Sequence, residues 1–155
     1  MSVGFTHSIE IRTNETVTAE RMMDLPNGIR RGTGWNYTCE KTRTGYCFNP
    51  SFRNMPYHNS FVPKIDVAIT QSDGYTVLHL TGQPVEWIQV FTIIFCGFAL
   101  VMHALLLAIM VFTNSVELFP LLLTLLMCAF GYFLCRLGTK YTFQNVVKTI
   151  ENEFQ

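Results

Sequence analysis

The sequence predicts an α+β protein, in which a β-rich domain is interrupted by a two-helix hairpin and closed by a C-terminal amphipathic helix. Ile88–Phe112 holds 25 residues and Leu118–Cys135 holds 18, and neither contains Asp, Glu, Lys or Arg. A helix needs about 20 apolar residues to cross a bilayer. Because only Thr113–Glu117 separates the two segments, they must return as an antiparallel transmembrane hairpin. In the residues that precede these segments, apolar and polar side chains alternate with the period of about two residues that is typical of strands.

The first 86 residues are predicted to form a β-rich domain with one short helix. Ile65, Val67 and Ile69 alternate with polar residues, and turn-forming residues follow them, which indicates a β-hairpin. The helix is expected over 16–25, because Pro26-Asn27-Gly28 should stop it, and a basic turn is expected over 30–34. The expected strands are 5–13, 35–40, 44–49, 65–70 and 75–81.

A second helix is predicted at the C-terminal end of the chain. Its apolar residues recur at the i, i+3, i+4, i+7 and i+11 spacing of one helical face, and they are Phe143, Val146, Val147, Ile150 and Phe154. This face is expected to pack back on the β domain or to lie at the membrane surface. The predicted units are therefore the β domain 1–86, the hairpin 87–136 with spans 88–112 and 118–135, and the closing helix 137–155.

The distribution of basic residues predicts the orientation of the hairpin. The loop Thr113–Glu117 contains no Lys or Arg, whereas Arg136 and Lys140 follow the second span at once. Lys and Arg concentrate on the cytoplasmic side of membrane proteins. We therefore expect an inner (cytoplasmic) membrane protein with both termini in the cytoplasm, where Cys39 and Cys47 stay free thiols. The other three cysteines lie within the spans and are expected to act as small apolar residues.

Each predicted span carries one stripe of small and polar residues at the same helical spacing. Such residues let helices approach closely and add hydrogen bonds between them. We expect these stripes to form the seam of the hairpin, with Ala99 opposite Gly131 and His103 near Met127 and Cys128. Since His103 is ionisable, it is also a functional candidate, although a neutral imidazole bonded to Thr124 or a backbone carbonyl is the simpler interpretation. The two stripes are Thr92, Cys96, Ala99 and His103, and Thr124, Cys128, Gly131 and Cys135.

A basic stretch with interleaved aromatic residues provides the candidate ligand site of the β domain. Such a surface can take a phosphate, a nucleotide or an anionic lipid headgroup, although it is more often a solvated strand face. The candidate ligand-binding residues are Arg30, Arg31, Trp35, Tyr37 and Arg43.

The remaining composition argues against most other functions. The first 87 residues carry eight basic and eight acidic side chains, so no basic field for nucleic acid exists. No catalytic residue, metal site or cofactor is expected, because the chain lacks C-x-x-C, H-E-x-x-H, G-x-S-x-G and complete phosphate-loop motifs. The chain is therefore predicted not to be an enzyme.

From Tyr46 onward the chain resembles a group of small, largely uncharacterised bacterial two-span membrane proteins. The resemblance is carried by the string Asn59-Ser60-Phe61-Val62-Pro63, by Pro120 and by Phe130-Gly131-Tyr132. In outline the group is similar to bacterial pleckstrin-like and YcxB-like membrane domains. The resemblance implies a β-rich cytoplasmic domain that is interrupted by two spans and closed by a helix. It implies no activity and no site residues.

The sequence therefore favours a non-enzymatic integral membrane protein, whose cytoplasmic β domain binds a ligand, a lipid or a protein partner. One alternative is a defence effector, in which a nucleotide binds the domain and self-association of the hairpin disrupts the membrane. Another is an immunity or accessory subunit that holds a partner membrane protein. The expected partners are the lipid bilayer, a second copy of the chain or another membrane protein, and a nucleotide or anionic lipid as ligand.

Overall fold

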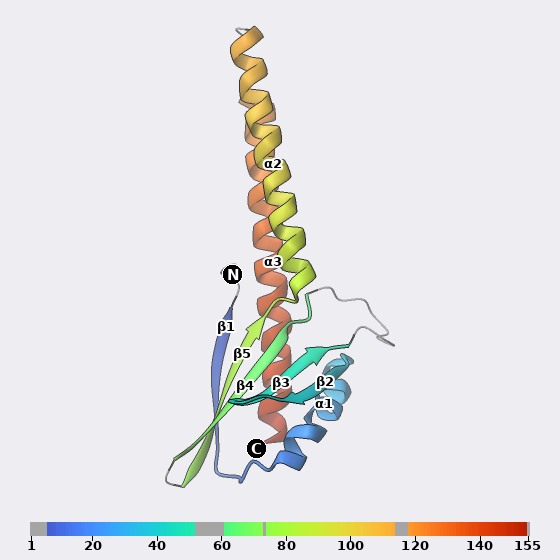
Figure 1. Ribbon diagram of the computed structural model, residues 1–155, viewed down its shortest axis with the longest axis vertical. Helices are drawn as coiled ribbons and strands as arrows, with labels where there is room; N and C mark the ends of the chain where they lie inside the picture. The colour runs from blue at the N-terminus through green and yellow to red at the C-terminus, as the bar shows by residue number, and fades with distance from the viewer. Residues whose placement is uncertain (1–5, 52–60, 73, 114–117, 155) are drawn as a thin grey trace. The chain divides into compact units, whose positions relative to one another are not determined.

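The computed structural model describes residues 6–51, 61–72, 74–113 and 118–154, and it has an α+β fold. Its residues divide into two compact units, Met1–Val85 with Thr139–Gln155, and Glu86–Gly138. The first unit contains a five-stranded antiparallel sheet, and the second contains two long apolar helices. The elements of both units are labelled in Figure 1.

The sheet of the first unit has the strand order β1-β5-β4-β3-β2. Its longest pairing joins β4 to β5, from Lys64 opposite Gln83 to Ser72 opposite Tyr75. This pairing confirms the predicted β-hairpin over 65–81, and β1 pairs along its whole length with the other edge of β5. The strands are β1 His7–Thr13, β2 Tyr37–Lys41, β3 Gly45–Pro50, β4 Lys64–Ser72 and β5 Tyr75–Gln83.

The first helix, α1, spans Ala19–Thr33, so the prediction that it stops at Pro26 is wrong. Pro26 lies inside the helix and has no N–H for the carbonyl one turn earlier. The helix continues because its buried residues, which include Leu25 and Ile29, recur on one face toward the sheet. Gly34 then ends it with a left-handed φ of 76°, and its N–H donates to the Arg30 carbonyl. The predicted basic turn over 30–34 is thus the last turn of α1.

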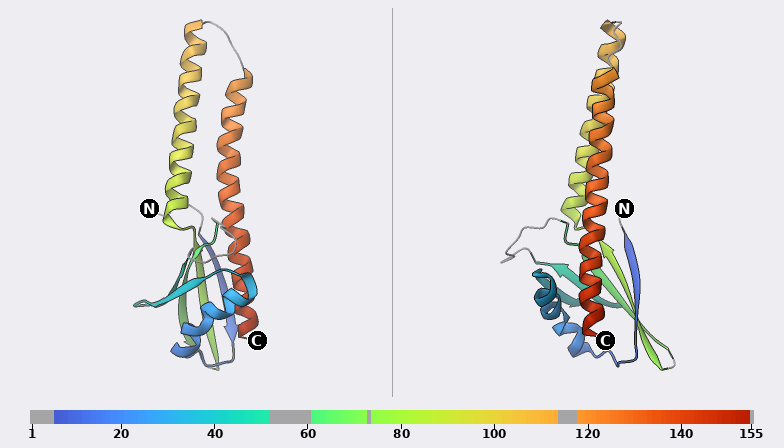
Figure 2. Two further views of the ribbon diagram at one scale, coloured as in Figure 1. Left: turned by 90° about the vertical axis from the view of Figure 1, so that its right-hand side faces the viewer. Right: turned by 180° about the vertical axis from the view of Figure 1, so that it is seen from behind.

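The last helix, α3, spans Leu118–Glu153 without a break, so the second apolar segment and the C-terminal amphipathic segment form one continuous helix. The two compact units nevertheless divide within this helix, between Gly138 and Thr139. Gly138 costs a helix only about 1 kcal/mol, and no proline follows it, so nothing stops the helix there. The helix therefore belongs to both units. Figure 2 shows it as one ribbon from end to end.

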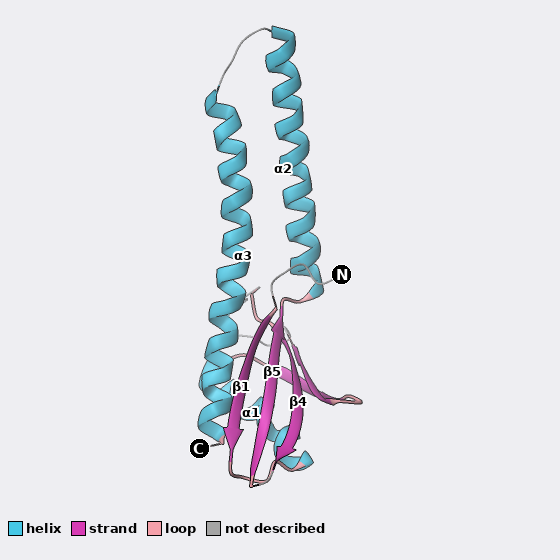
Figure 3. Cartoon of the chain, turned by 90° about the vertical axis from the view of Figure 1, so that its left-hand side faces the viewer, coloured by secondary structure: helices cyan, strands magenta, loops and turns pink. Residues whose placement is uncertain are grey.

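The apolar face of α3 packs on the sheet, which decides between the two positions predicted for it. Phe143, Val146 and Ile150 are at most 1% exposed, and they join α1 and the strands in one core cluster. Figure 3 shows α1 and this part of α3 on the same side of the sheet.

Polar contacts hold the C-terminal end of α3 to β1 and α1. The Thr13 hydroxyl donates to the Phe154 carbonyl at 3.2 Å. Arg21 donates to the Glu153 carbonyl, forms an ion pair with Glu15 and places its guanidinium 4.7 Å from the centre of the Phe154 ring. Two backbone carbonyls at the C-terminal end of the helix, where intrahelical donors run out, are thereby given donors.

Candidate functional site

The five candidate ligand residues do not form one exposed surface. Tyr37 is 7% exposed, and its hydroxyl donates to the Pro63 carbonyl at 3.0 Å, so it is a core residue. Burial raises the pKa of the Tyr37 hydroxyl, which stays protonated. Trp35 is partly buried against the same core.

The three arginines of this set lie at the surface. Arg30 and Arg31 are exposed in the last turn of α1, and Arg43 is exposed between β2 and β3. Arg31 Nη2 lies 3.3 Å from Glu153 Oε1, so one of the three charges already has an anionic neighbour. Arg53, which the sequence places in the same stretch, lies outside the described residues, as do Asn59 and Ser60 of the string Asn59–Pro63.

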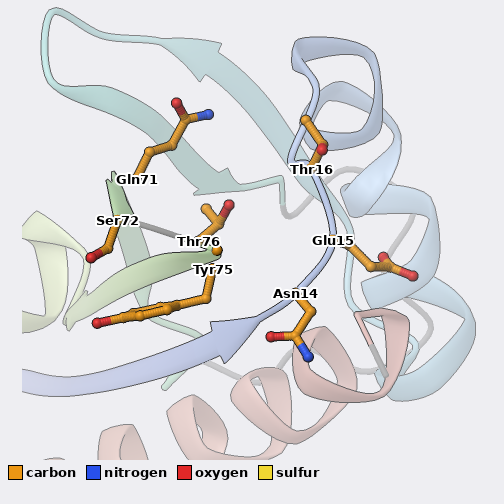
Figure 4. A pocket seen from close by; sticks show the side chains of 8 residues that line it. Asn14, Glu15, Thr16, Gln71, Ser72, Tyr75 and Thr76 are labelled. Carbon is orange, nitrogen blue, oxygen red and sulfur yellow. The ribbon is translucent and has the colours of Figure 1, made fainter.

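A small cavity of about 310 Å³ lies instead at one end of the sheet, between the β1–α1 connection and the β4–β5 hairpin. Figure 4 shows the side chains that come from these two segments. Thr76 is 5% exposed and lies among the residues that line the cavity. The cavity is lined by Asn14, Glu15, Thr16, Gln71, Ser72, Gly74, Tyr75 and Thr76.

The lining of this cavity suits neutral polar groups. Its described residues supply amides and hydroxyls, no Lys, Arg or His, and one carboxylate, Glu15, which pairs with Arg21. The sequence analysis did not predict this cavity, because Asn, Ser, Thr and Gly residues of this kind are common in ordinary turns. Only the register, which sets Thr76 between Thr13 and Gln71, brings the two segments together.

The two cysteines of the sheet are free thiols. Burial, together with a hydrogen bond with Asp66, raises the pKa of Cys47 to about 11. Burial and the neighbouring Glu40 raise the pKa of Cys39 as well. Both thiols therefore stay protonated near neutral pH, which makes them weak nucleophiles and weak metal ligands.

In the second unit, the predicted stripes of α2 (Glu86–Thr113) and α3 make contacts with each other. His103 Nδ1 lies 2.8 Å from Thr124 Oγ1. Thr92 Oγ1 lies 3.4 Å from Cys135 Sγ. Figure 2 shows the two helices running side by side in opposite directions.

The hydroxyl of Thr124 lies between the imidazole of His103 and a backbone carbonyl. It lies 2.9 Å from the Leu121 carbonyl as well as 2.8 Å from His103 Nδ1, so it can donate to the first and accept from the Nδ1–H tautomer of the second. This contact agrees with the predicted hydrogen bond between the imidazole and Thr124, and His103 has no other bonded partner among the described residues.

The seam differs from the predicted register by about one helical turn. Gly131 faces the ring of Phe95, which lies one turn before the expected Ala99. His103 likewise meets Thr124, one turn before Cys128, whose thiol lies 4.0 Å from the Cys96 carbonyl. Sequence spacing alone could not set this register, because it depends on the connection 114–117, which lies outside the described residues.

The outer surface of the hairpin is apolar. Phe112 is 90% exposed, Val111 is 79% exposed and Phe119 is 76% exposed. Both helices are long and apolar enough to span a membrane, and no part of their most apolar windows is buried inside the protein. Polar groups inside and apolar groups outside reverse the usual pattern of a water-soluble helix pair.

Within the described residues, no group of three or more His, Cys, Asp or Glu side chains is placed to hold a metal ion. No protein-family model, no curated protein and no solved structure matches this chain. Its function is therefore inferred from its own residues.

Proposed function

We propose that this chain is a non-enzymatic membrane-anchored binding module. The observation that carries the proposal is the distribution of polarity in the α2–α3 hairpin. Its hydroxyls, thiols and imidazole lie at the seam, whereas its large apolar side chains are exposed. A lipid environment stabilises such a surface, and water does not.

The hairpin is proposed to anchor the chain in the inner membrane with both termini in the cytoplasm. Arg136 and Lys140 follow the second apolar segment, whereas no Lys or Arg occurs between the two segments. In this orientation the sheet domain faces the cytoplasm, where the free state of Cys39 and Cys47 is expected.

Thiol labelling in bacterial spheroplasts tests the proposed orientation. In a chain without its native cysteines, Ser115→Cys is expected to react with a membrane-impermeant maleimide from outside. Thr42→Cys is exposed on the sheet domain, and we expect it to react only after lysis. The reverse pattern would show the opposite orientation, and a chain that carbonate releases from the membrane would refute insertion.

The sheet domain is proposed to hold the ligand or protein partner. Its cavity offers hydroxyl and amide groups, among them the side chain of Thr76. We do not extend the proposal to a nucleotide at this cavity, because its lining contains no cation for a phosphate.

Native mass spectrometry of the gently extracted full chain tests the binding role. We expect a retained small molecule or a stoichiometric partner protein, and Thr76→Val is expected to weaken retention of a cavity ligand. Thr70→Val is the matched control, because Thr70 is exposed on a neighbouring strand and does not line the cavity. A bare chain under all gentle conditions would contradict a binding module.

A further inference from the structure

One face of α3 combines two cations with two exposed amphipathic or apolar side chains. Arg136 and Lys140 are four residues apart and exposed, so their side chains lie on the same helical face. Leu137 and Tyr141 repeat the same spacing beside them and are 61% and 67% exposed. We call these four residues the α3 basic face.

The two charges of the α3 basic face are not neutralised by the described residues. Neither Arg136 nor Lys140 takes part in an ion pair there. The first acidic residue that follows them on α3 is Glu151, about three turns beyond Lys140. The face therefore presents two adjacent positive charges to its surroundings.

The position of the face along the helix restricts what these charges can meet. Arg136 directly follows the charge-free segment Leu118–Cys135. Long cationic side chains at the end of a membrane helix extend toward the headgroup layer, and tyrosine is favoured at the same depth. An exposed leucine beside them is costly in water but not at the boundary of the acyl chains.

We propose that the α3 basic face binds the headgroup of an anionic phospholipid. Arg136 supplies a planar fork of donors to the phosphate, and Lys140 adds a second charge one turn away. Leu137 and Tyr141 contact the upper part of the acyl chains. This inference depends on the proposed membrane insertion, and it adds a preference for lipid charge that insertion alone does not require.

Lipid retention by the full-length protein tests this inference. The chain is reconstituted in vesicles of equal phosphatidylcholine and phosphatidylglycerol, extracted gently and measured by native mass spectrometry. We expect phosphatidylglycerol to be retained on the order of tenfold over phosphatidylcholine, which is the scale of two basic residues near an anionic surface. This preference is expected to fall as salt rises.

Matched variants distinguish lipid binding by the α3 basic face from attraction by the overall charge of the protein. Arg136→Gln/Lys140→Gln is expected to abolish the lipid preference. Lys41→Gln/Lys148→Gln removes the same charge from exposed positions outside the face and is expected to keep the preference. Retention of both lipids in equal amounts by the unchanged protein, or an unchanged preference in the first variant, would overturn the proposal.

The same preparation distinguishes this inference from membrane insertion. A chain that floats with pure phosphatidylcholine vesicles and resists carbonate extraction is inserted, whatever its lipid preference. Insertion without a charge preference would refute only the lipid site. Failure to float with either vesicle would refute the membrane anchor itself.

Discussion

Replacing Phe143 with alanine is expected to lower the free energy of unfolding of the sheet domain by about 3–5 kcal/mol. Phe143 is 1% exposed and is among the largest fully buried side chains of the protein. It lies on the α3 face that packs against the sheet, where its ring stacks on His7 with 6.2 Å between ring centres. Alanine would remove this packing and leave a cavity between helix and sheet. Guanidinium unfolding of the full chain, followed by circular dichroism, measures the change.

A control and a paired substitution make this expectation specific. Gln144 is exposed on the same turn of α3, so Gln144→Ala is expected to change stability by less than about 0.5 kcal/mol. A side chain at Gly82 would overlap the Phe143 ring, so Gly82→Ala should cost about 1–3 kcal/mol by overpacking. Phe143→Leu in the Gly82→Ala protein is expected to recover part of that loss. A near-neutral Phe143→Ala would show that α3 does not pack on the sheet as described.

The sheet of this protein is predictable from sequence because its signals are local. Ile65, Val67 and Ile69 alternate over the length of a strand, and a turn follows them, so both the pairing and the buried face are specified. The ends of the helices are less predictable. Pro26 and Gly138 are residues that weaken helices, yet burial on one face of α1 and the absence of any other stop signal in α3 outweigh them.

The candidate sites show the same division between local and long-range information. The stripes of the hairpin were identified from spacing, because helical periodicity determines which residues share a face. Their register and the burial of Tyr37 depend on partners far away in the chain, such as Pro63, which is 26 residues from Tyr37. The cavity around Thr76 depends on strand pairing in the same way. No pattern within one segment contains that information.

Placing arginine on the outer surface of both long helices is expected to prevent stable membrane insertion. Leu100 and Leu126 lie near the middle of the two charge-free segments and are 63% and 67% exposed. At the centre of a membrane helix, exchanging leucine for arginine costs about 3 kcal/mol by insertion scales. Leu100→Arg/Leu126→Arg should therefore lose about 6 kcal/mol of insertion free energy. Carbonate extraction and vesicle flotation are expected to move the variant from the membrane to the soluble or degraded fraction.

The double arginine substitution is informative because its expected effect on the protein differs between a hairpin in water and a hairpin in lipid. If the hairpin were exposed to water, arginine at two exposed positions would leave stability nearly unchanged and would reduce aggregation. If the hairpin lies in lipid, the same side chains must carry their charge through hydrocarbon or pull the helices out of place. Leu100→Phe/Leu126→Phe, which changes shape but adds no charge, is expected to remain in the membrane. If the unchanged chain is itself soluble, folded and monomeric without detergent, and the arginine variant behaves in the same way, these helices lie in water and the anchor is refuted.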